Sequence, residues 1–173
     1  MTKEEMTIDC RKAIYNRLDN LGMKILRVPG NSETIRIISG TWKGQDWTDK
    51  TARIRCSSLK NQRFYPKGVN AYGWVAQDWR QALDYDLLIC GAYSDEDVRI
   101  FVFSSKEIGS LPDVHLRWFM EIRKRLQLFQ STSDLDAAIE YVNNRKDGRL
   151  GVISSWEEGV NRKILKGSDN FDL

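Results

Sequence analysis

The chain has 173 residues, of which 41% are hydrophobic and 29% charged, and its formal net charge is +3. This composition is typical of a globular protein with its own hydrophobic core, at a length that fits one domain, and it excludes a collagen, a disordered tail and a disulfide scaffold. Because no run approaches about 18 uncharged apolar residues and the N-terminal residues are charged, we expect neither a membrane span nor a signal peptide.

A helix is the first predicted element. Thr2 and Glu5 have the spacing of a capping box, and Gly22 supplies a stop signal. Between them, apolar residues recur at helical intervals: Met6, Cys10, Ile14, Leu18 and Leu21. The sequence therefore predicts one amphipathic helix over this stretch.

Two strands are predicted next. A short apolar run at 24–28 and a turn lead into a strand at 33–42, and a polar loop at 43–50 leads into a strand at 51–58. The second strand alternates strictly, with Ala52, Ile54 and Cys56 on one face and Arg53 and Arg55 on the other.

The rest of the chain predicts both helices and strands. In order, these are a helix at 71–83, a buried hairpin with strands at 85–93 and 98–103, a helix from Pro112 to Phe129, and a last helix capped by Ser131 or Ser133. This order predicts an α+β or mixed α/β fold with a central mixed sheet and flanking helices. We expect one domain at 1–150 and a polar C-terminal tail at 151–173.

The three cysteines, at positions 10, 56 and 90, have no CxxC spacing. Scattered cysteines in an odd number are typical of reduced thiols, so we expect a cytoplasmic protein.

Charge is unevenly distributed. Residues 24–68 hold ten basic and three acidic groups, a net of +7, whereas residues 84–108 carry a net of −4. Aromatic residues lie among the basic ones, and this combination suits a polyanion because cations bind phosphate and flat rings stack on bases. The alternatives are a solvated basic face over core aromatics, and a protein-interaction module or inhibitor that uses the acidic block.

The order of elements over about residues 7–108 resembles the PD-(D/E)XK nuclease superfamily, which contains restriction and homing endonucleases and Holliday-junction resolvases. The resemblance is strongest in the strand that begins Asp84-Tyr85-Asp86 and in the strand that leads into Ser104-Ser105-Lys106-Glu107. It implies a restriction-endonuclease-like fold, a Mg²⁺-dependent activity on DNA and a homodimer.

The metal motif of that superfamily departs from its pattern here. The superfamily holds Mg²⁺ with an aspartate on one strand and a Glu/Gln-x-Lys on the next, but here Arg53-Ile54-Arg55 fills the second place and Arg36 lies near the first. Arginine has only hydrogen-bond donors, so it binds phosphate and not a cation. We therefore predict a DNA-binding protein without the usual metal site and without a cofactor. Its predicted phosphate contacts are Arg36, Arg53, Arg55, Lys60, Arg63 and Lys67.

Two other interpretations stay open. A shifted register would give an active Mg²⁺-dependent endonuclease, with Glu33 and Asp46 as metal ligands and Glu33, Asp46 and Lys60 as its catalytic set. Alternatively, the strand arginines form one solvated sheet face whose charge is balanced by nearby acids.

Overall fold

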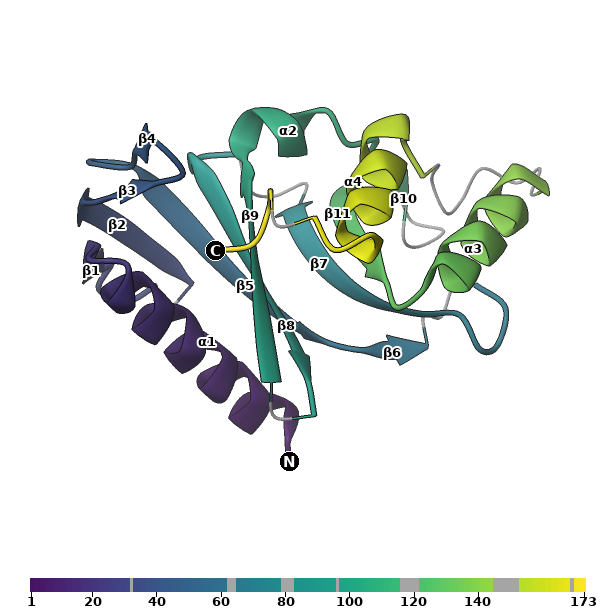
Figure 1. The fold of residues 1–173 in the computed structure, drawn as a ribbon, viewed down its shortest axis with the longest axis horizontal. Coiled ribbons are helices and arrows are strands. Elements are labelled where there is room, and N and C mark those ends of the chain that lie inside the picture. The colour runs from purple at the N-terminus through teal and green to yellow at the C-terminus, as the bar shows by residue number, and fades with distance from the viewer. Residues whose placement is uncertain are drawn as a thin grey trace. The chain divides into compact units, whose positions relative to one another are not determined.

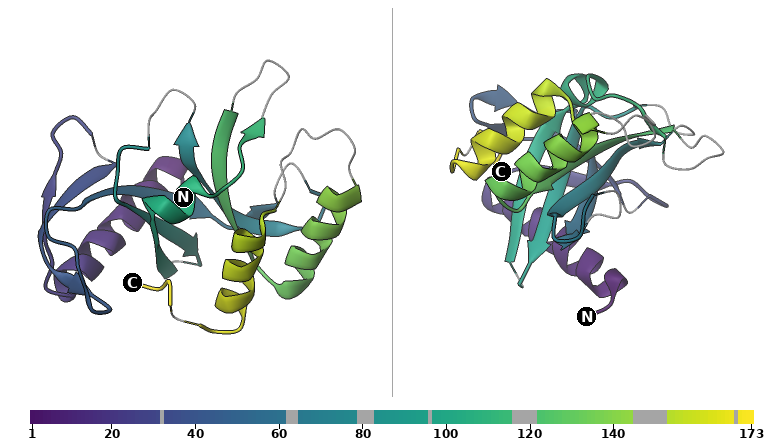
Figure 2. Two further views of the ribbon diagram at one scale, coloured as in Figure 1. Left: turned by 90° about the horizontal axis from the view of Figure 1, so that it is seen from above. Right: turned by 90° about the vertical axis from the view of Figure 1, so that its right-hand side faces the viewer.

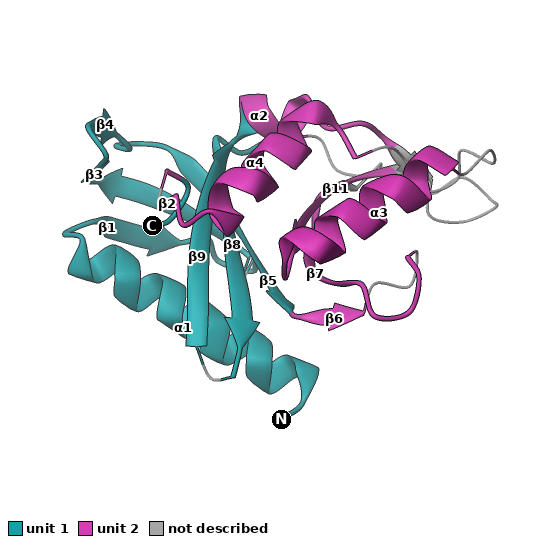
Figure 3. Ribbon diagram, turned by 45° about the vertical axis from the view of Figure 1, so that its right-hand side comes forward, with its two compact units in different colours: residues 1–58, 84–105, 171–173 teal, residues 59–83, 106–170 magenta. Residues whose placement is uncertain are grey.

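The structure, a computed structural model, describes residues 1–31, 33–61, 65–78, 83–95, 97–115, 122–144, 153–168 and 170–173. Two compact units divide the chain (Figure 3). Unit 1 comprises residues 1–58, 84–105 and 171–173, and unit 2 comprises residues 59–83 and 106–170. Both units contain strands and helices, which confirms the predicted mixed α+β class.

Unit 1 is built on a five-stranded mixed sheet (Figure 1). Its strands, in spatial order, are β1 (Lys24–Arg27), β2 (Thr34–Ser39), β5 (Thr51–Ser58), β8 (Leu87–Ser94) and β9 (Asp97–Ser104). β5 and β8 are parallel, and the other neighbours are antiparallel. The predicted loop at 43–50 contains part of a small hairpin formed by β3 (Thr41–Trp42) and β4 (Gln45–Asp46).

Helix α1 (Lys3–Asn20) covers one face of this sheet (Figures 1 and 2). Its predicted capping box is confirmed, because Glu5 N donates to Thr2 Oγ1 at 3.1 Å and Thr2 N donates to Glu5 Oε2. Met6, Cys10, Ile14 and Leu18 form the buried face as predicted, whereas Leu21 caps the helix and is exposed. Gly22 follows with a φ of +80° that favours glycine. The core that α1 closes includes Ile14, Leu18, Ile35, Ile37, Ile54, Ile89 and Val102.

The two faces of β5 have the predicted alternation. Ala52 and Ile54 pack in the core beneath α1, and Cys56 on the same face forms a disulfide with Cys10. The expectation of reduced thiols is therefore wrong for this pair, because the helix face and the strand face meet at these two positions. A Cβ on Gly91 would collide with Cys10 Sγ, so a glycine on β8 permits this close approach.

Unit 2 contains a four-stranded antiparallel sheet and two longer helices. The strand order is β10 (Val114–His115), β11 (Ile122–Phe129), β7 (Asn70–Asp78) and β6 (Lys60–Asn61). The short helix α2 (Ser105–Gly109) begins at the last residue of the central segment of unit 1. None of the described helices is long and apolar enough to cross a membrane.

Two helix predictions are wrong. Residues 70–78 and 122–129 form the paired strands β7 and β11. The helical spacing of apolar residues within 71–83 competes with a period-two pattern, in which Trp74 and Ala76 lie on the buried face of β7 and Leu126 and Leu128 lie on the buried face of β11. Leu126 lies opposite Trp74, and this long-range pairing favours strands over helices. Trp79 and Phe119, which fall within the two predicted helices, lie outside the described residues.

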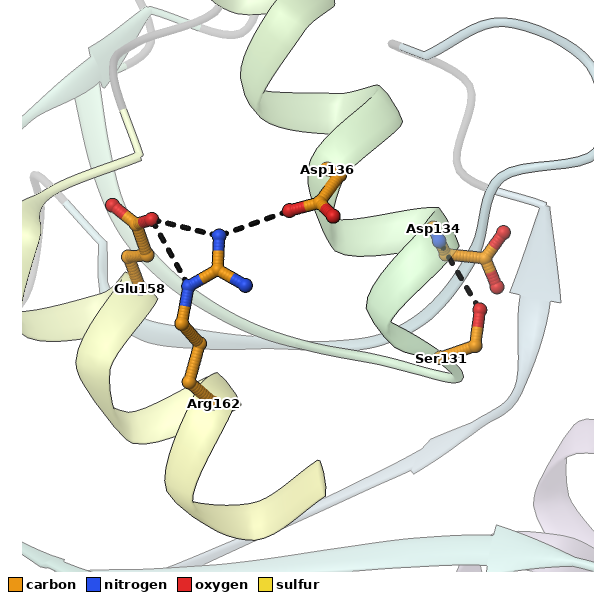
Figure 4. A network of polar contacts seen from close by, with 5 residues as sticks. All are labelled: Ser131, Asp134, Asp136, Glu158 and Arg162. Carbon is orange, nitrogen blue, oxygen red and sulfur yellow. Dashed lines mark hydrogen bonds and ion pairs between the residues drawn. The ribbon is translucent and has the colours of Figure 1, made fainter. Parts of the chain in front are cut away.

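Helices α3 (Thr132–Asn144) and α4 (Ser155–Leu165) lie side by side in unit 2 (Figure 2). Ser131 caps α3, as predicted, because Asp134 N donates to Ser131 Oγ at 3.1 Å. Arg162 on α4 joins the two helices through Asp136, at 2.9 Å, and also bonds Glu158 (Figure 4). The sequence did not predict α4, which lies within the expected tail, and the division at residue 150 stays a prediction.

Candidate functional site

The candidate site lies where β2 begins beside β5. Glu33 immediately precedes β2, and its carbonyl oxygen accepts a hydrogen bond from Ile54 N at 2.7 Å. Its carboxylate lies between two arginines: Oε2 is 2.9 Å from Arg55 Nη1, and Oε1 is 3.7 Å from Arg11 Nη2. The exposed fraction is 39% for the Glu33 side chain, 23% for Arg55 and 22% for Arg11. Solvent therefore reaches a carboxylate held by guanidinium groups from a helix and a strand.

A second ion pair belongs to the same strand. Arg53 shares the face of β5 with Arg55, and its Nη2 donates to Asp84 Oδ1 at 3.2 Å. The Arg53 guanidinium also lies 5.2 Å from the centroid of the Tyr85 ring. Asp84 is mostly exposed, whereas Arg53 is nearly buried. We call Arg11, Glu33, Arg53, Arg55 and Asp84 the arginine site.

Tyr85 and Cys90 lie close to the arginines but carry no charge near neutral pH. Burial raises the pKa of Tyr85 above its ordinary value, and burial also raises the pKa of Cys90, although the charge of Arg55 opposes that shift. Cys90 lies opposite Arg55 in the register of β8 with β5 and is fully buried. The cationic charge of the site therefore has no thiolate or phenolate to balance it.

These residues do not fit a Mg²⁺ site. Arg53, Ile54 and Arg55 lie on β5, where Arg53 is opposite Thr34 at the start of β2. Magnesium needs oxygen ligands, whereas guanidinium groups offer only N–H donors and repel a cation. Within the described part of the chain, no group of three or more His, Cys, Asp or Glu side chains could hold a metal ion. The donor set suits an anion.

Two other predicted residues of unit 1 lie outside this cluster. Arg36 is exposed on β2 and pairs with Asp49 at 3.1 Å. Asp46, on β4, accepts hydrogen bonds from Thr48 Oγ1 and Thr48 N at 2.7 and 2.9 Å, and these bonds lower its pKa. Although both residues are described, the structure shows no interaction between Asp46 and Glu33. The Asp46 carboxylate is engaged in its own turn.

The remaining predicted residues belong to unit 2. Lys60 is exposed on β6, opposite Ala71, and Lys67 is exposed in the turn after Pro66. Arg63 lies outside the described residues. The three residues of the alternative catalytic set are thus in the arginine site, in the β3–β4 hairpin and in unit 2, respectively.

Sequence reasoning missed Arg11 and the pairing of Asp84. Arg11 follows the buried Cys10 on α1, and no local pattern predicts that its side chain reaches a residue before β2. Asp84 and Tyr85 were noted only as the beginning of a strand, yet they contact Arg53. A motif scan along the chain finds neither contact, because both join segments far apart in sequence.

Unit 2 holds a separate buried polar cluster. The backbone N of Gln127 donates to Glu157 Oε2 at 2.9 Å, and the backbone N of Phe129 donates to Asn161 Oδ1 at 2.8 Å. Asn161 Nδ2 donates in turn to the carbonyl of Gln127. Burial raises the pKa of Glu157 to about 8, although the hydrogen bond from Gln127 and the charge of Arg125 oppose it. We call Gln127, Phe129, Glu157 and Asn161 the edge cluster, since side chains of α4 satisfy the backbone of β11 there.

Comparison with known proteins gives few matches. No family model matches the chain, and no curated protein matches it. Among solved structures, it is similar to a bacterial homing endonuclease, I-Ssp6803I, with 14% sequence identity and a TM-score of 0.45, over 95% of this chain and 92% of that chain. A likeness this distant does not establish a shared activity.

Proposed function

We propose that the chain is a DNA-binding protein on a nuclease-like scaffold, which contacts phosphates through the arginine site and does not cut DNA. The observation that supports this proposal is the Glu33 carboxylate held between Arg11 and Arg55. A place that holds one anionic group between two guanidinium groups also suits a phosphate, which arginine binds through several N–H donors.

The charge distribution supports DNA as the source of that phosphate. Residues 24–68 carry a net of +7, and this block contains β2 and β5, whose Arg36, Arg53 and Arg55 have alternating positions on one face of the sheet. Exposed Lys60 and Lys67 in the same block add cations. A polyanion with evenly spaced charges gains from such a surface because binding releases its condensed counterions.

A salt series tests the binding. We expect purified protein to shift fluorescently labelled duplex and branched DNA, with an affinity that falls steeply between about 50 and 200 mM salt. Arg55→Gln should weaken binding about tenfold and lower the salt slope by about one. Arg162→Gln is the matched control, since Arg162 is also a partly exposed arginine and forms ion pairs with Asp136 and Glu158 in unit 2. Equal losses in both variants, with unchanged thermal unfolding, would contradict the assignment of the arginine site.

A nicking assay separates this proposal from the active endonuclease. Supercoiled plasmid should stay intact with the protein in Mg²⁺ and in Mn²⁺, as it does in EDTA. Metal-dependent nicking that is lost in both Glu33→Gln and Asp46→Asn would overturn the proposal in favour of the displaced-acid enzyme. If neither binding nor nicking is found, a protein-interaction module becomes the better hypothesis, and affinity capture of a partner tests it.

The oligomeric state is a separate expectation. The resemblance implies a homodimer, which would let two arginine sites reach the two strands of a duplex. Light scattering of the protein, free and with a short duplex, distinguishes one copy per duplex from two.

A further inference from the structure

We propose that Glu33 is an internal mimic of phosphate: its carboxylate occupies the anion position between Arg11 and Arg55 in the free protein and leaves when a DNA phosphate binds. This inference rests on the proposed function and deepens it. The two carboxylate oxygens are divided between the two arginines, with Oε2 at Arg55 Nη1 and Oε1 at Arg11 Nη2. Two non-bridging oxygens of a phosphodiester can be divided in the same way.

The Glu33 side chain can leave without a change of the strand. Its backbone is fixed on both sides, because its carbonyl accepts from Ile54 N and its own N donates to Asn31 Oδ1 at 3.1 Å. The carboxylate, by contrast, is more than a third exposed, and its only described partners are the two arginines. Ion pairs at this exposure contribute little to stability, so rotation of the side chain into water has a small cost.

The two arginines, unlike the glutamate, are attached to positions that the fold holds together. Arg11 follows Cys10 directly and Arg55 precedes Cys56 directly, and the disulfide joins these two cysteines. The backbone spacing of Arg11 and Arg55 is thereby fixed across α1 and β5. The guanidinium pair forms the permanent part of the site, and the carboxylate is the exchangeable part.

The site also has a hydrogen-bond donor that Glu33 does not satisfy. Arg55 Nε is buried and has no acceptor among the described residues. A buried donor without an acceptor is unfavourable. A phosphate brings more oxygens than a carboxylate, so it can satisfy donors that the glutamate leaves unused.

Three roles for Glu33 predict three different results when its charge is removed. If Glu33 is a metal ligand, removal of its charge abolishes nicking activity. If Glu33 only forms a structural ion pair, the same change alters the unfolding temperature and leaves DNA affinity unchanged. If Glu33 is an internal phosphate mimic, removal of its charge raises DNA affinity. Glu33→Gln then binds DNA more tightly, because the competing anion is absent and the side chain keeps its size.

The experiment compares single-charge variants by fluorescence anisotropy with a short labelled duplex at low salt. We expect Glu33→Gln to bind about threefold to tenfold more tightly than the unchanged protein, with unfolding temperature nearly unchanged. Asp136→Asn is the matched control, because it removes the same charge from an ion pair with Arg162 in unit 2 and thus reports the general effect of net charge. The gain should be specific to Glu33.

A double variant locates the gain at the arginine pair. Arg11→Gln alone should weaken binding, and the gain from Glu33→Gln should shrink when Arg11→Gln is also present. Wild-type binding without a gain in Glu33→Gln, or an equal gain in Asp136→Asn, would overturn the mimic while leaving the proposed function intact. If neither wild type nor Glu33→Gln binds DNA at low salt, the proposed function fails and the mimic fails with it.

Discussion

Glu33 and Glu157 are both glutamates close to arginine charge, yet their surroundings give them opposite roles. Glu33 is partly exposed, and among the residues that the structure describes its carboxylate contacts only Arg11 and Arg55. Glu157 is buried and accepts a hydrogen bond from the backbone N of Gln127, and burial raises its pKa to about 8. A carboxylate held by exposed side chains can be exchanged for another anion, whereas one bonded to buried backbone is part of the scaffold.

The arginines beside these two glutamates also differ in burial. Burial lowers the pKa of Arg125 in unit 2, and the charges of Tyr65 and Glu157 act against that shift. Tyr65 OH also donates to Gln127 Oε1 at 2.6 Å, so Arg125 belongs to a packed polar interior. Arg11 and Arg55 instead combine partial burial with access from solvent. The same residue types, Glu and Arg, therefore form an accessible anion site where they are partly exposed and a structural contact where they are buried.

The pH dependence of stability tests the structural role of the buried Glu157. Glu157 has a pKa of about 8 in the folded state against an ordinary 4.5, so the folded state holds a proton that the unfolded state has lost between these values. Its contribution therefore lowers the free energy of unfolding as pH rises from about 4.5 to 8, after which the effect levels off. Glu157→Gln should remove this dependence and be more stable at pH 9 by roughly 5 kcal/mol, since the two pKa values lie about 3.5 apart and each pKa unit corresponds to about 1.4 kcal/mol.

Urea unfolding of wild type and Glu157→Gln at pH 5 and pH 9 measures this effect. The two proteins should agree at pH 5 and diverge at pH 9. Glu33→Gln is the control, because a half-exposed side chain should show no comparable gain at high pH. A Glu157→Gln variant that is equally stable or less stable than wild type at pH 9 would contradict the assignment of Glu157 as a buried structural carboxyl group.

Asn161→Ala should cause a loss of about 3 kcal/mol in the free energy of unfolding. The substitution removes partners from the backbone N of Phe129 and from the carbonyl oxygens of Gln127 and Glu157, all in buried hydrogen bonds. Each buried group left without a partner costs about 1–3 kcal/mol. Arg162→Ala on the same helix should cost about 1 kcal/mol or less, since its ion pairs are partly exposed. Equal losses for the two variants in urea unfolding would remove the distinction between buried and exposed contacts.

The disulfide tests how far the arginine site depends on its backbone. Cys10→Ser with Cys56→Ser should lower the free energy of unfolding by about 2–3 kcal/mol, because the unfolded chain is no longer cross-linked over 46 residues. At temperatures where the variant is folded, its DNA affinity should fall modestly, because Arg11 and Arg55 lose their fixed spacing. Thermal unfolding and anisotropy on the same samples measure both effects. An unchanged unfolding temperature would mean that the cross-link does not constrain this protein.

Local signals were sufficient for several elements. The capping box at Thr2, the positive-φ Gly22 and the apolar spacing of α1 all lie within one segment, so each could be predicted without knowledge of its neighbours. β5 was predicted as a strand for the same reason, although burial along it does not alternate strictly, because Ala52, Arg53 and Ile54 are all buried. β7 and β11 could not be predicted, because short apolar patterns there fit both periods and only the pairing of Leu126 with Trp74 favours the strand.

The sequence by itself determined the basic block at 24–68 and the two arginines of Arg53-Ile54-Arg55 on one face of β5. Charge and the alternation of side chains along a strand are properties of the chain, so both could be predicted without the structure. Only the tertiary structure decided that Glu33 lies between Arg11 and Arg55, that Cys10 meets Cys56, and that Glu157 closes the edge of β11. Each of these contacts joins separate elements. Their geometry depends on how a helix packs on a sheet, which no local pattern encodes.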